Sequence, residues 1–358
     1  MAAPYWINAL STFAVIAALI WWRPPRPIAQ SLPAEHFVSA IRGGLRYARY
    51  NPDLRATLIR AAGFFPLASV YWALLPLLVR AQIAGGPEIY GVLLGAIGAG
   101  AVCGAFALPI VARLGADRVV AGATVGTALA LALFAIAREP ATALIACVFA
   151  GISWVAAIAT LNVSAQFALP GWVRERGMAM FATVQFAGLA VGSIVFGRAA
   201  QVIGLPAVHI IAAVALVASV LLLRRWKLET AAGLDLAPSM RWPAPLLEHD
   251  IDPDRGPVLV TVEYTVAAAD RGAFLAAMAK LASERRRDGA YNWGIYGDAA
   301  QEGAFIETFS VDSWLEHLRQ HQRVTNADRV LQDSVHRFQA EGDPAVRHLI
   351  AARGSQTT

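Results

Sequence analysis

The feature that most constrains this chain is an uncharged apolar segment that runs from Tyr90 to Val111. A helix needs about 20 apolar residues to cross the hydrocarbon core of a bilayer, and this segment is long enough. Only 15% of the residues are charged, against about 25% in soluble proteins. The chain is therefore predicted to be a membrane protein. Its basic residues cluster between apolar runs, which indicates membrane topology rather than a nucleic-acid partner.

Seven apolar segments are candidate membrane spans. They cover about 4–22, 56–79, 89–112, 119–137, 141–169, 177–200 and 205–223. Lys and Arg concentrate in alternate loops, and the positive-inside rule assigns such loops to the cytoplasm. The rule places the 23–55 loop, the 113–118 turn, the 170–176 loop and the C-terminus inside, and the N-terminus outside. We expect a multi-pass protein of the cell (inner or plasma) membrane, in contact with lipid.

Glycines indicate where the predicted helices meet. Two pairs in the segment 89–112 and one pair in 177–200 have the small-xxx-small spacing that lets helix backbones approach closely in lipid. The predicted packing residues are Gly91, Gly95, Gly100, Gly104, Gly188 and Gly192.

Polar and aromatic side chains within the apolar runs are candidate cavity residues. Uncharged polar groups in lipid usually hydrogen-bond another helix, and that interpretation stays open. The alternative is a cavity lined by aromatic and amide groups, suited to an aromatic or catechol-like small molecule. The candidates are Tyr71, Trp72, Trp154, Asn162, Gln166 and Gln185.

A charged pair, Asp117 and Arg118, occupies the turn between the third and fourth segments. Asp117 can cap the next helix, where an anion is favoured, and Arg118 can be a cytoplasmic basic residue. Asp117 can also act as a conformational latch, forming an ion pair with an Arg of a neighbouring helix in one state of a transporter. The two interpretations are compatible.

The composition changes after Trp226, and residues 227–256 are predicted to be a linker. Strands are predicted at 258–266, 290–298, 303–311 and 345–352, with helices at 270–287, 313–323 and 327–340. The order β-α-β-β-α-β, with an extra helix, indicates a ferredoxin-like α+β domain. The predicted divisions are a first span (1–22), a cytoplasmic loop (23–55), a six-helix half (56–226), the linker (227–256), the α+β domain (257–352) and a tail (353–358).

Two segments outside the spans have alternative interpretations. Residues 34–50 form an amphipathic helix that either packs under the spans or senses lipid. In the α+β domain the candidate residues are Trp293, Trp314, His317 and His321, of which the last three share one helix face. Since no metal site or nucleophile–base pair is evident, we expect an interaction or dimerisation domain without catalysis, cofactor or metal. A cofactor-free monooxygenase-like activity stays open.

The turn ARLGADRVV resembles the major facilitator superfamily motif G-x-x-x-D-R-x-G-R/K-R/K, matching at Asp117 and Arg118 and departing at Arg113 and at 120–122. The segments 160–181, 313–329 and 346–351 resemble the enterobactin-exporter-like branch, often described as transmembrane secretion effectors. In that branch a cytoplasmic domain similar to the antibiotic-biosynthesis-monooxygenase fold follows the last span. The resemblance covers nearly the whole chain and implies a transporter rather than an enzyme.

The resemblance implies export of small hydrophobic or siderophore-like molecules by alternating access, driven by protons in the full-length form. It relates the first segment to the sixth of twelve spans, and residues 56–226 to the C-terminal half. Substrate in this superfamily sits between two halves. Two expectations follow. Either the chain is truncated or mis-started and is a non-transporting remnant, or it pairs with a second chain. A membrane-tethered monooxygenase-like or binding domain is the other alternative.

Overall fold

The computed structural model describes residues 3–23, 37–228, 235–237, 239, 251–340 and 342–352. It divides into two units, residues 1–36 and 37–358. In the first unit, helix α1 (Ala3–Trp21) contains a short apolar helical stretch, Asn8–Trp21. The predicted tail 353–358 and most of the predicted linker 227–256 lie outside the described residues.

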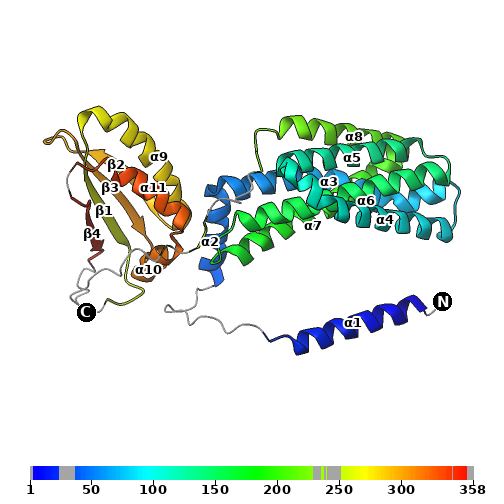
Figure 1. Cartoon of the computed structure of the whole chain (residues 1–358), viewed down its shortest axis with the longest axis horizontal. Coiled ribbons are helices and arrows are strands. Elements are labelled where there is room, and N and C mark those ends of the chain that lie inside the picture. Colours follow the sequence, from blue (N-terminus) through cyan, green and yellow to red (C-terminus); the bar gives the residue numbers. More distant parts are fainter. Residues whose placement is uncertain are drawn as a thin grey trace. The chain divides into compact units, whose positions relative to one another are not determined.

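Six helices of the described residues are long and apolar enough to cross a membrane, where the sequence predicted seven. The difference is the first segment, which is a shorter apolar helix, Asn8–Trp21. The six are α3 (Pro52–Ala81), α4 (Pro87–Val111, followed by the short helix η1, Ala112–Leu114), α5 (Ala116–Ile136), α6 (Pro140–Phe167), α7 (Arg174–Ile203) and α8 (Leu205–Leu222) (Figure 1).

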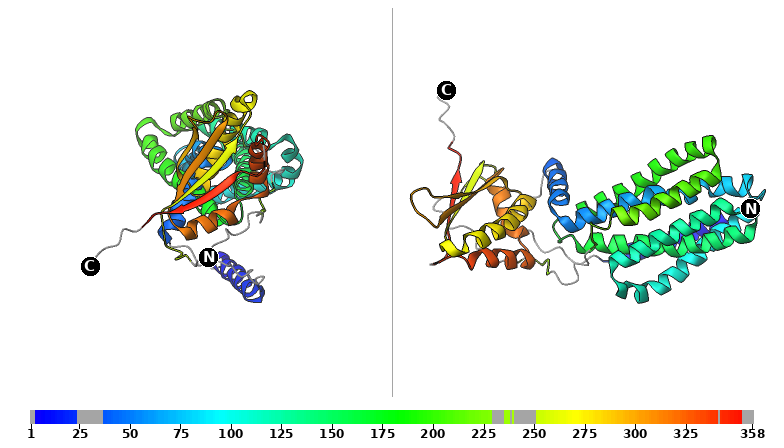
Figure 2. Two further views of the ribbon diagram at one scale, coloured as in Figure 1. Left: turned by 90° about the vertical axis from the view of Figure 1, so that its left-hand side faces the viewer. Right: turned by 90° about the horizontal axis from the view of Figure 1, so that it is seen from above.

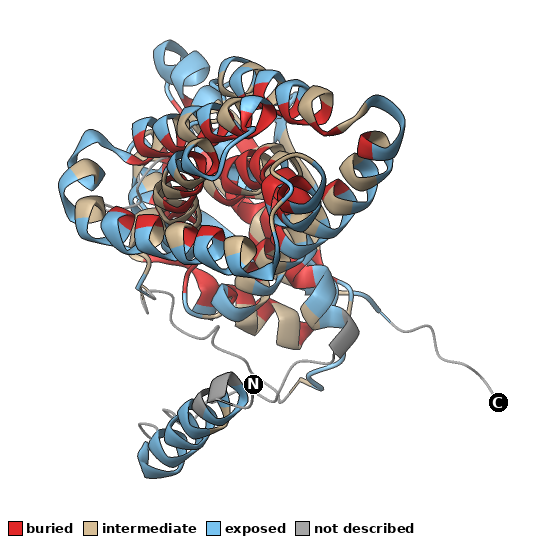
Figure 3. Ribbon diagram, turned by 90° about the vertical axis from the view of Figure 1, so that its right-hand side faces the viewer, coloured by how far each residue is buried: buried red, intermediate tan, exposed pale blue. Residues whose placement is uncertain are grey.

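The six helices pack as a bundle around an aromatic and aliphatic core. Helix α6 contacts α4 and α5, α3 contacts α7 and α8, and α5 contacts α8. Buried residues line the inside of the bundle, whereas exposed ones face outward (Figure 3). Large apolar side chains such as Phe106, Ile194 and Leu222 are exposed on this outer surface. An apolar exterior of this kind suits contact with lipid.

The glycines of α4 divide between two faces of the helix. A methyl group at Gly100 or Gly104 would collide with the backbone of α6 at Val148 or Ile152. At Gly91 and Gly95, in contrast, no atom lies within 4 Å, and both residues are exposed. The prediction of close packing at Gly91 and Gly95 is therefore wrong. Nine residues of helix turn the chain through about two and a half turns, so the two pairs point in opposite directions.

Helix α7 approaches α3 through its own pair of glycines. A methyl group at Gly192 would collide with the carbonyl of Pro66, and one at Gly188 would lie 3.1 Å from the Pro66 ring. The proline removes a backbone donor from α3 and presents its ring to the neighbouring helix. These two glycines therefore set the distance between α3 and α7.

Helix α2 (Phe37–Tyr50) lies at the end of the bundle. Its Tyr47 is buried, and the Tyr47 hydroxyl donates a hydrogen bond of 3.0 Å to the carbonyl of Ala168, just after α6. Ile41 and Leu45, two apolar residues of this helix, are exposed. The amphipathic helix thus packs against the bundle and still presents apolar side chains outward.

The C-terminal residues form a four-stranded antiparallel sheet in the order β2-β3-β1-β4. Its strands are β1 (Val258–Thr265), β2 (Tyr291–Gly297), β3 (Ala304–Val311) and β4 (Ala345–Ile350). Its helices are η2 (Ala268–Asp270), α9 (Arg271–Asp288), α10 (Trp314–Arg323) and α11 (Asn326–His336). Helices α9 and α11 pack together beside the sheet (Figures 1 and 2). The central strand buries Val258, Val260 and Val262 in alternation, as a half-buried strand should.

Helix α10 connects this C-terminal domain to the bundle through charged side chains. The guanidinium of Arg323 donates to the Glu316 carboxylate at 2.6 Å, and Arg46 of α2 lies 3.3 Å from the same carboxylate. Arg323 also lies over the ring of Trp172, in the α6–α7 loop, at 4.6 Å from the centroid. The side chains of α10 therefore contact the bundle in two ways, through a shared ion pair and through a cation–π contact.

Candidate functional site

Three of the predicted cavity residues come together inside the bundle. The rings of Tyr71 and Trp72 on α3 lie 6.4 Å and 5.5 Å from that of Trp154 on α6, measured between centroids. Phe64 and Phe65 extend the cluster, at 6.3 Å and 5.8 Å from Trp154. Tyr71 is buried, and its hydroxyl has no hydrogen-bond partner among the described residues. The cluster offers flat apolar surfaces and one polar atom.

Two of the predicted amides, Asn162 and Gln166, do not join this cluster. Gln166 donates a hydrogen bond to Asn162 one turn earlier on α6, and Gln166 is exposed. Asn162 lies eight residues beyond Trp154, which is about 12 Å along a helix. Gln185 is buried on α7. The structure therefore brings the aromatic candidates together and places the Asn162–Gln166 pair nearer the end of the bundle.

Asp117 lies in the first turn of α5 and accepts two hydrogen bonds from other parts of the chain. Arg60 Nη2 on α3 donates to Asp117 Oδ1 at 2.6 Å, and the backbone N–H of Leu228 donates to the same oxygen at 3.1 Å. Arg60 Nε also donates to the carbonyl of Trp226 at 3.2 Å. Arg118, its predicted companion, is exposed. The Arg60–Asp117 pair thus ties α3, α5 and the segment after α8 together.

Sequence reasoning missed Arg60. The residue lies inside the apolar run 56–79 and is only 7% exposed. A charged side chain inside a membrane span is costly unless it is paired, and this is the signal that finds it. The carboxylate of Asp117 supplies the pairing.

An apolar cavity of about 130 Å³ lies at the same end of the bundle as the Arg60–Asp117 pair. Its lining includes Leu108 of α4, Ala116 and Val119 of α5, and Ala159 of α6. Ser164 also lines it and is buried, with no hydrogen-bond partner for its hydroxyl among the described residues. Ala116 and Val119 of the lining lie on either side of Asp117 in the sequence, and the Ser164 hydroxyl is an unsatisfied polar group in an otherwise mostly apolar cavity.

The candidate residues of the C-terminal domain separate into two places. Trp293 on β2 donates its Nε1–H to the buried Glu307 carboxylate at 2.8 Å. Trp314, His317 and His321 lie together on α10, where the rings of His317 and His321 are 4.5 Å apart. His348 of β4, which sequence reasoning did not group with these three residues, has its ring 4.6 Å from that of His317. The alternation along β4 predicts on which face of the sheet His348 lies. It does not predict that α10 covers that face.

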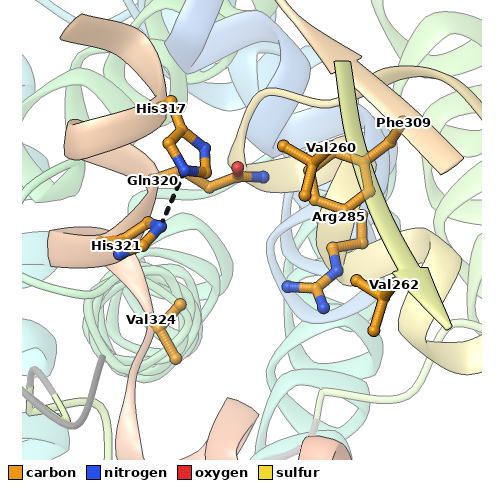
Figure 4. Close-up of a pocket in the computed structure, with 8 residues that line it drawn as sticks. All are labelled: Val260, Val262, Arg285, Phe309, His317, Gln320, His321 and Val324. Carbon is orange, nitrogen blue, oxygen red and sulfur yellow. Dashed lines mark hydrogen bonds between the residues drawn. The ribbon is translucent and has the colours of Figure 1, made fainter. Parts of the chain in front are cut away.

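Burial keeps these imidazoles neutral. It lowers the pKa of His317 to about 3 and that of His321 to about 4, and it lowers the pKa of His348 as well. His317 and His321 line a cavity of about 10 Å³ that is also lined by Arg285, Gln320 and Val260 (Figure 4). The guanidinium of Arg285 pairs with Glu307 at 3.3 Å, so its charge is compensated. The cavity is large enough for one water molecule or ion.

Glu284 on α9 is a buried carboxyl group that makes folding depend on pH. Burial raises its pKa from 4.5 to about 8, and the nearby Asp328 carboxylate adds to the rise. Between these pH values the folded chain holds a proton that the unfolded chain has released, so the free energy of unfolding falls as the pH rises. This stabilisation is complete below about pH 4.5 and is lost as the pH passes about 8.

We therefore expect Glu284→Gln to raise the apparent melting temperature at about pH 9 and to change it little at about pH 5. Gln332 Nε2 donates to Glu284 Oε1 at 2.7 Å, and a glutamine keeps that acceptor. Glu302→Gln, on the exposed loop between β2 and β3, is the matched control and should change neither value. An equal shift at both pH values for Glu284→Gln would contradict the prediction.

Comparison with protein families gives a match over residues 1–356 to a model described as transmembrane secretion effector. Comparison with curated proteins gives no match. Among solved structures, a candidate antibiotic biosynthesis monooxygenase from Caulobacter crescentus CB15 covers 28% of this chain and 94% of its own, at 16% identity and a TM-score of 0.25. That likeness is too weak to carry an argument.

Proposed function

Because the chain belongs to the transmembrane secretion effector family of major facilitator transporters, we propose that it exports small hydrophobic or siderophore-like molecules by alternating access. A multi-pass membrane protein of this family is a transporter rather than an enzyme. The proposal includes proton-driven efflux, the cell membrane as its location and a cytoplasmic C-terminal domain. Its proposed partners are lipid, the small-molecule substrate and a second chain.

The observation that carries the proposal is the Arg60–Asp117 pair. It joins α3 to α5 at 2.6 Å and holds the segment after α8 through Leu228, all at the end of the bundle. Alternating access requires an element with two arrangements, and a contact that exists in only one of them fixes the balance. The Arg60–Asp117 ion pair is such a contact, because it joins α3 to α5 and also holds the segment that follows α8.

The aromatic cluster supports the substrate class. Tyr71, Trp72 and Trp154 present ring faces with one unsatisfied hydroxyl, a combination that suits a flat ligand with few polar groups. Trp72 is 38% exposed, so the cluster is open on one side. A catechol belongs to this class of ligand, because it is a flat ring with two hydroxyl groups.

A ferredoxin-like fold is proposed for the domain 257–352, and the strand order β2-β3-β1-β4 supports it. A membrane-tethered binding domain is the second candidate function. The specific observation in its favour is the group of three histidines, the buried His317 and the half-buried His321 and His348.

The test is retention of a catechol siderophore in a host that lacks its own efflux systems. Cells that express this chain should retain less of it than cells with an empty vector, and Trp154→Ala should remove most of the difference. Phe186→Ala, an aromatic residue 64% exposed on the outer surface of α7, is the matched control and should transport normally. Retention equal to that of the empty vector would refute transport by this chain.

A further inference from the structure

Three histidines of the C-terminal domain converge from two elements. His317 and His321 are one turn apart on α10, and His348 comes from the edge strand β4. One ring nitrogen from each lies within 4.8 Å of the other two. The Nε2 atoms of His317 and His321 are 3.1 Å apart, within hydrogen-bonding distance.

The geometry is close to that of a metal centre. Zinc binds imidazole nitrogen at about 2.0–2.1 Å in a tetrahedral arrangement, which places neighbouring nitrogens about 3.3 Å apart. A triangle with no side above 4.8 Å has a point within about 2.8 Å of each corner. Side-chain shifts of less than about 1 Å therefore bring all three nitrogens to bonding distance. The i, i+4 spacing on one helix supplies two of the three ligands without backbone movement.

The surroundings suit a cation held by neutral ligands. His348 Nε2 is buried and has no hydrogen-bond partner among the described residues, and the same holds for His317 Nδ1. An unpaired polar atom at such a place is a cost that a bound ion or water would relieve. The nearest charged group lining the cavity is Arg285, and its ion pair with Glu307 compensates it. The cavity of about 10 Å³ has room for one ion or water.

We propose that His317, His321 and His348 form a three-histidine site for a divalent transition-metal ion, with Zn²⁺ as the expected occupant. Imidazole ligands select Zn²⁺, Cu²⁺, Ni²⁺ and Co²⁺ over Mg²⁺ and Ca²⁺, which prefer oxygen. Three protein ligands leave the fourth tetrahedral position for water or a small ligand in the adjoining cavity. The site goes beyond the proposed export function and does not depend on it.

The test is titration of the purified, metal-stripped full-length chain in detergent with Co²⁺, followed through its visible absorption. Wild type should bind one ion per chain with the bands of a tetrahedral site, and added Zn²⁺ should remove them. His348→Ala should weaken binding by about tenfold or more, since it removes one of three ligands from a half-buried position on an edge strand. His336→Ala, an exposed histidine at the end of α11, is the control and should bind as wild type does.

His317→Gln provides a second measurement. It should also lose the Co²⁺ bands, and its folding is checked by circular dichroism before titration. Absence of saturable binding at one ion per chain in the wild type would overturn the proposal. So would equal affinity in wild type and folded His348→Ala, because the histidines would then be a stacked core of the domain and no more.

Discussion

Gly151→Ala is expected to destabilise the helix bundle by about 3 kcal/mol, the upper part of the range for overpacking a core. A methyl group at Gly151 would collide with the carbonyl of Ile97 and lie 2.8 Å from the N–H nitrogen of Ala101, both on α4. Backbone atoms cannot rotate away as a side chain can, so α4 and α6 must separate. Their interface depends on reciprocal contacts, since Gly100 lies in the same way against Val148. The measurement is the apparent melting temperature in detergent, with the amount of folded protein in membranes beside it.

The matched control for this prediction is Gly95→Ala on α4. Gly95 is exposed and no atom lies within 4 Å of the added methyl group, so only helix propensity changes. Alanine is favoured over glycine in a helix by about 1 kcal/mol, so this variant should match or exceed wild type in stability. If Gly95→Ala and Gly151→Ala lost stability equally, the assignment of α6 to the Gly100 face of α4 would be wrong.

Asp117→Asn is expected to lower transport by about tenfold while lowering the amount of folded protein much less, a prediction that rests on the proposed export function. The substitution leaves the guanidinium of Arg60, 7% exposed, with the carbonyl of Trp226 and a neutral amide in place of a carboxylate. The arrangement that the pair stabilises becomes less populated. Transport is measured as siderophore retention and normalised to folded protein in the same membranes.

Two further variants make the result specific to the pair. Arg60→Gln should reproduce the transport defect, and Arg60→Gln combined with Asp117→Asn should be no worse than either alone, because both remove one interaction. Arg118→Gln, one residue away and exposed, should transport as wild type does. Parallel losses of transport and folded protein in Asp117→Asn would leave Asp117 as a helix cap and nothing more.

Much of the fold follows from local sequence patterns. Six apolar runs became six helices of spanning length, since a run without charge and near 20 residues has few other solutions. In the C-terminal domain, alternation such as that of Val258, Val260 and Val262 places β1 correctly in the centre of the sheet. These patterns depend on whether each residue faces water, lipid or the core, and they therefore predict helices and strands well.

What the sequence does not contain is the direction in which one helix meets another. Gly91 and Gly95 have the same spacing as Gly100 and Gly104, yet only the second pair faces α6. The partner of Asp117 is 57 residues away along the chain, and His348 is 27 residues beyond His321. Both pairings depend on how distant elements are brought together, and no local rule specifies it.

Helix α10 contacts both the sheet of the C-terminal domain and the helix bundle. His317 and His321 point to the sheet, while Glu316 and Arg323 contact Arg46 and Trp172 at the bundle. A ligand that prefers one position of α10 changes the affinity of the domain for the bundle, and docking changes the affinity for the ligand by the same factor. An ion bound at the proposed three-histidine site would then be coupled to the contact between the C-terminal domain and the bundle.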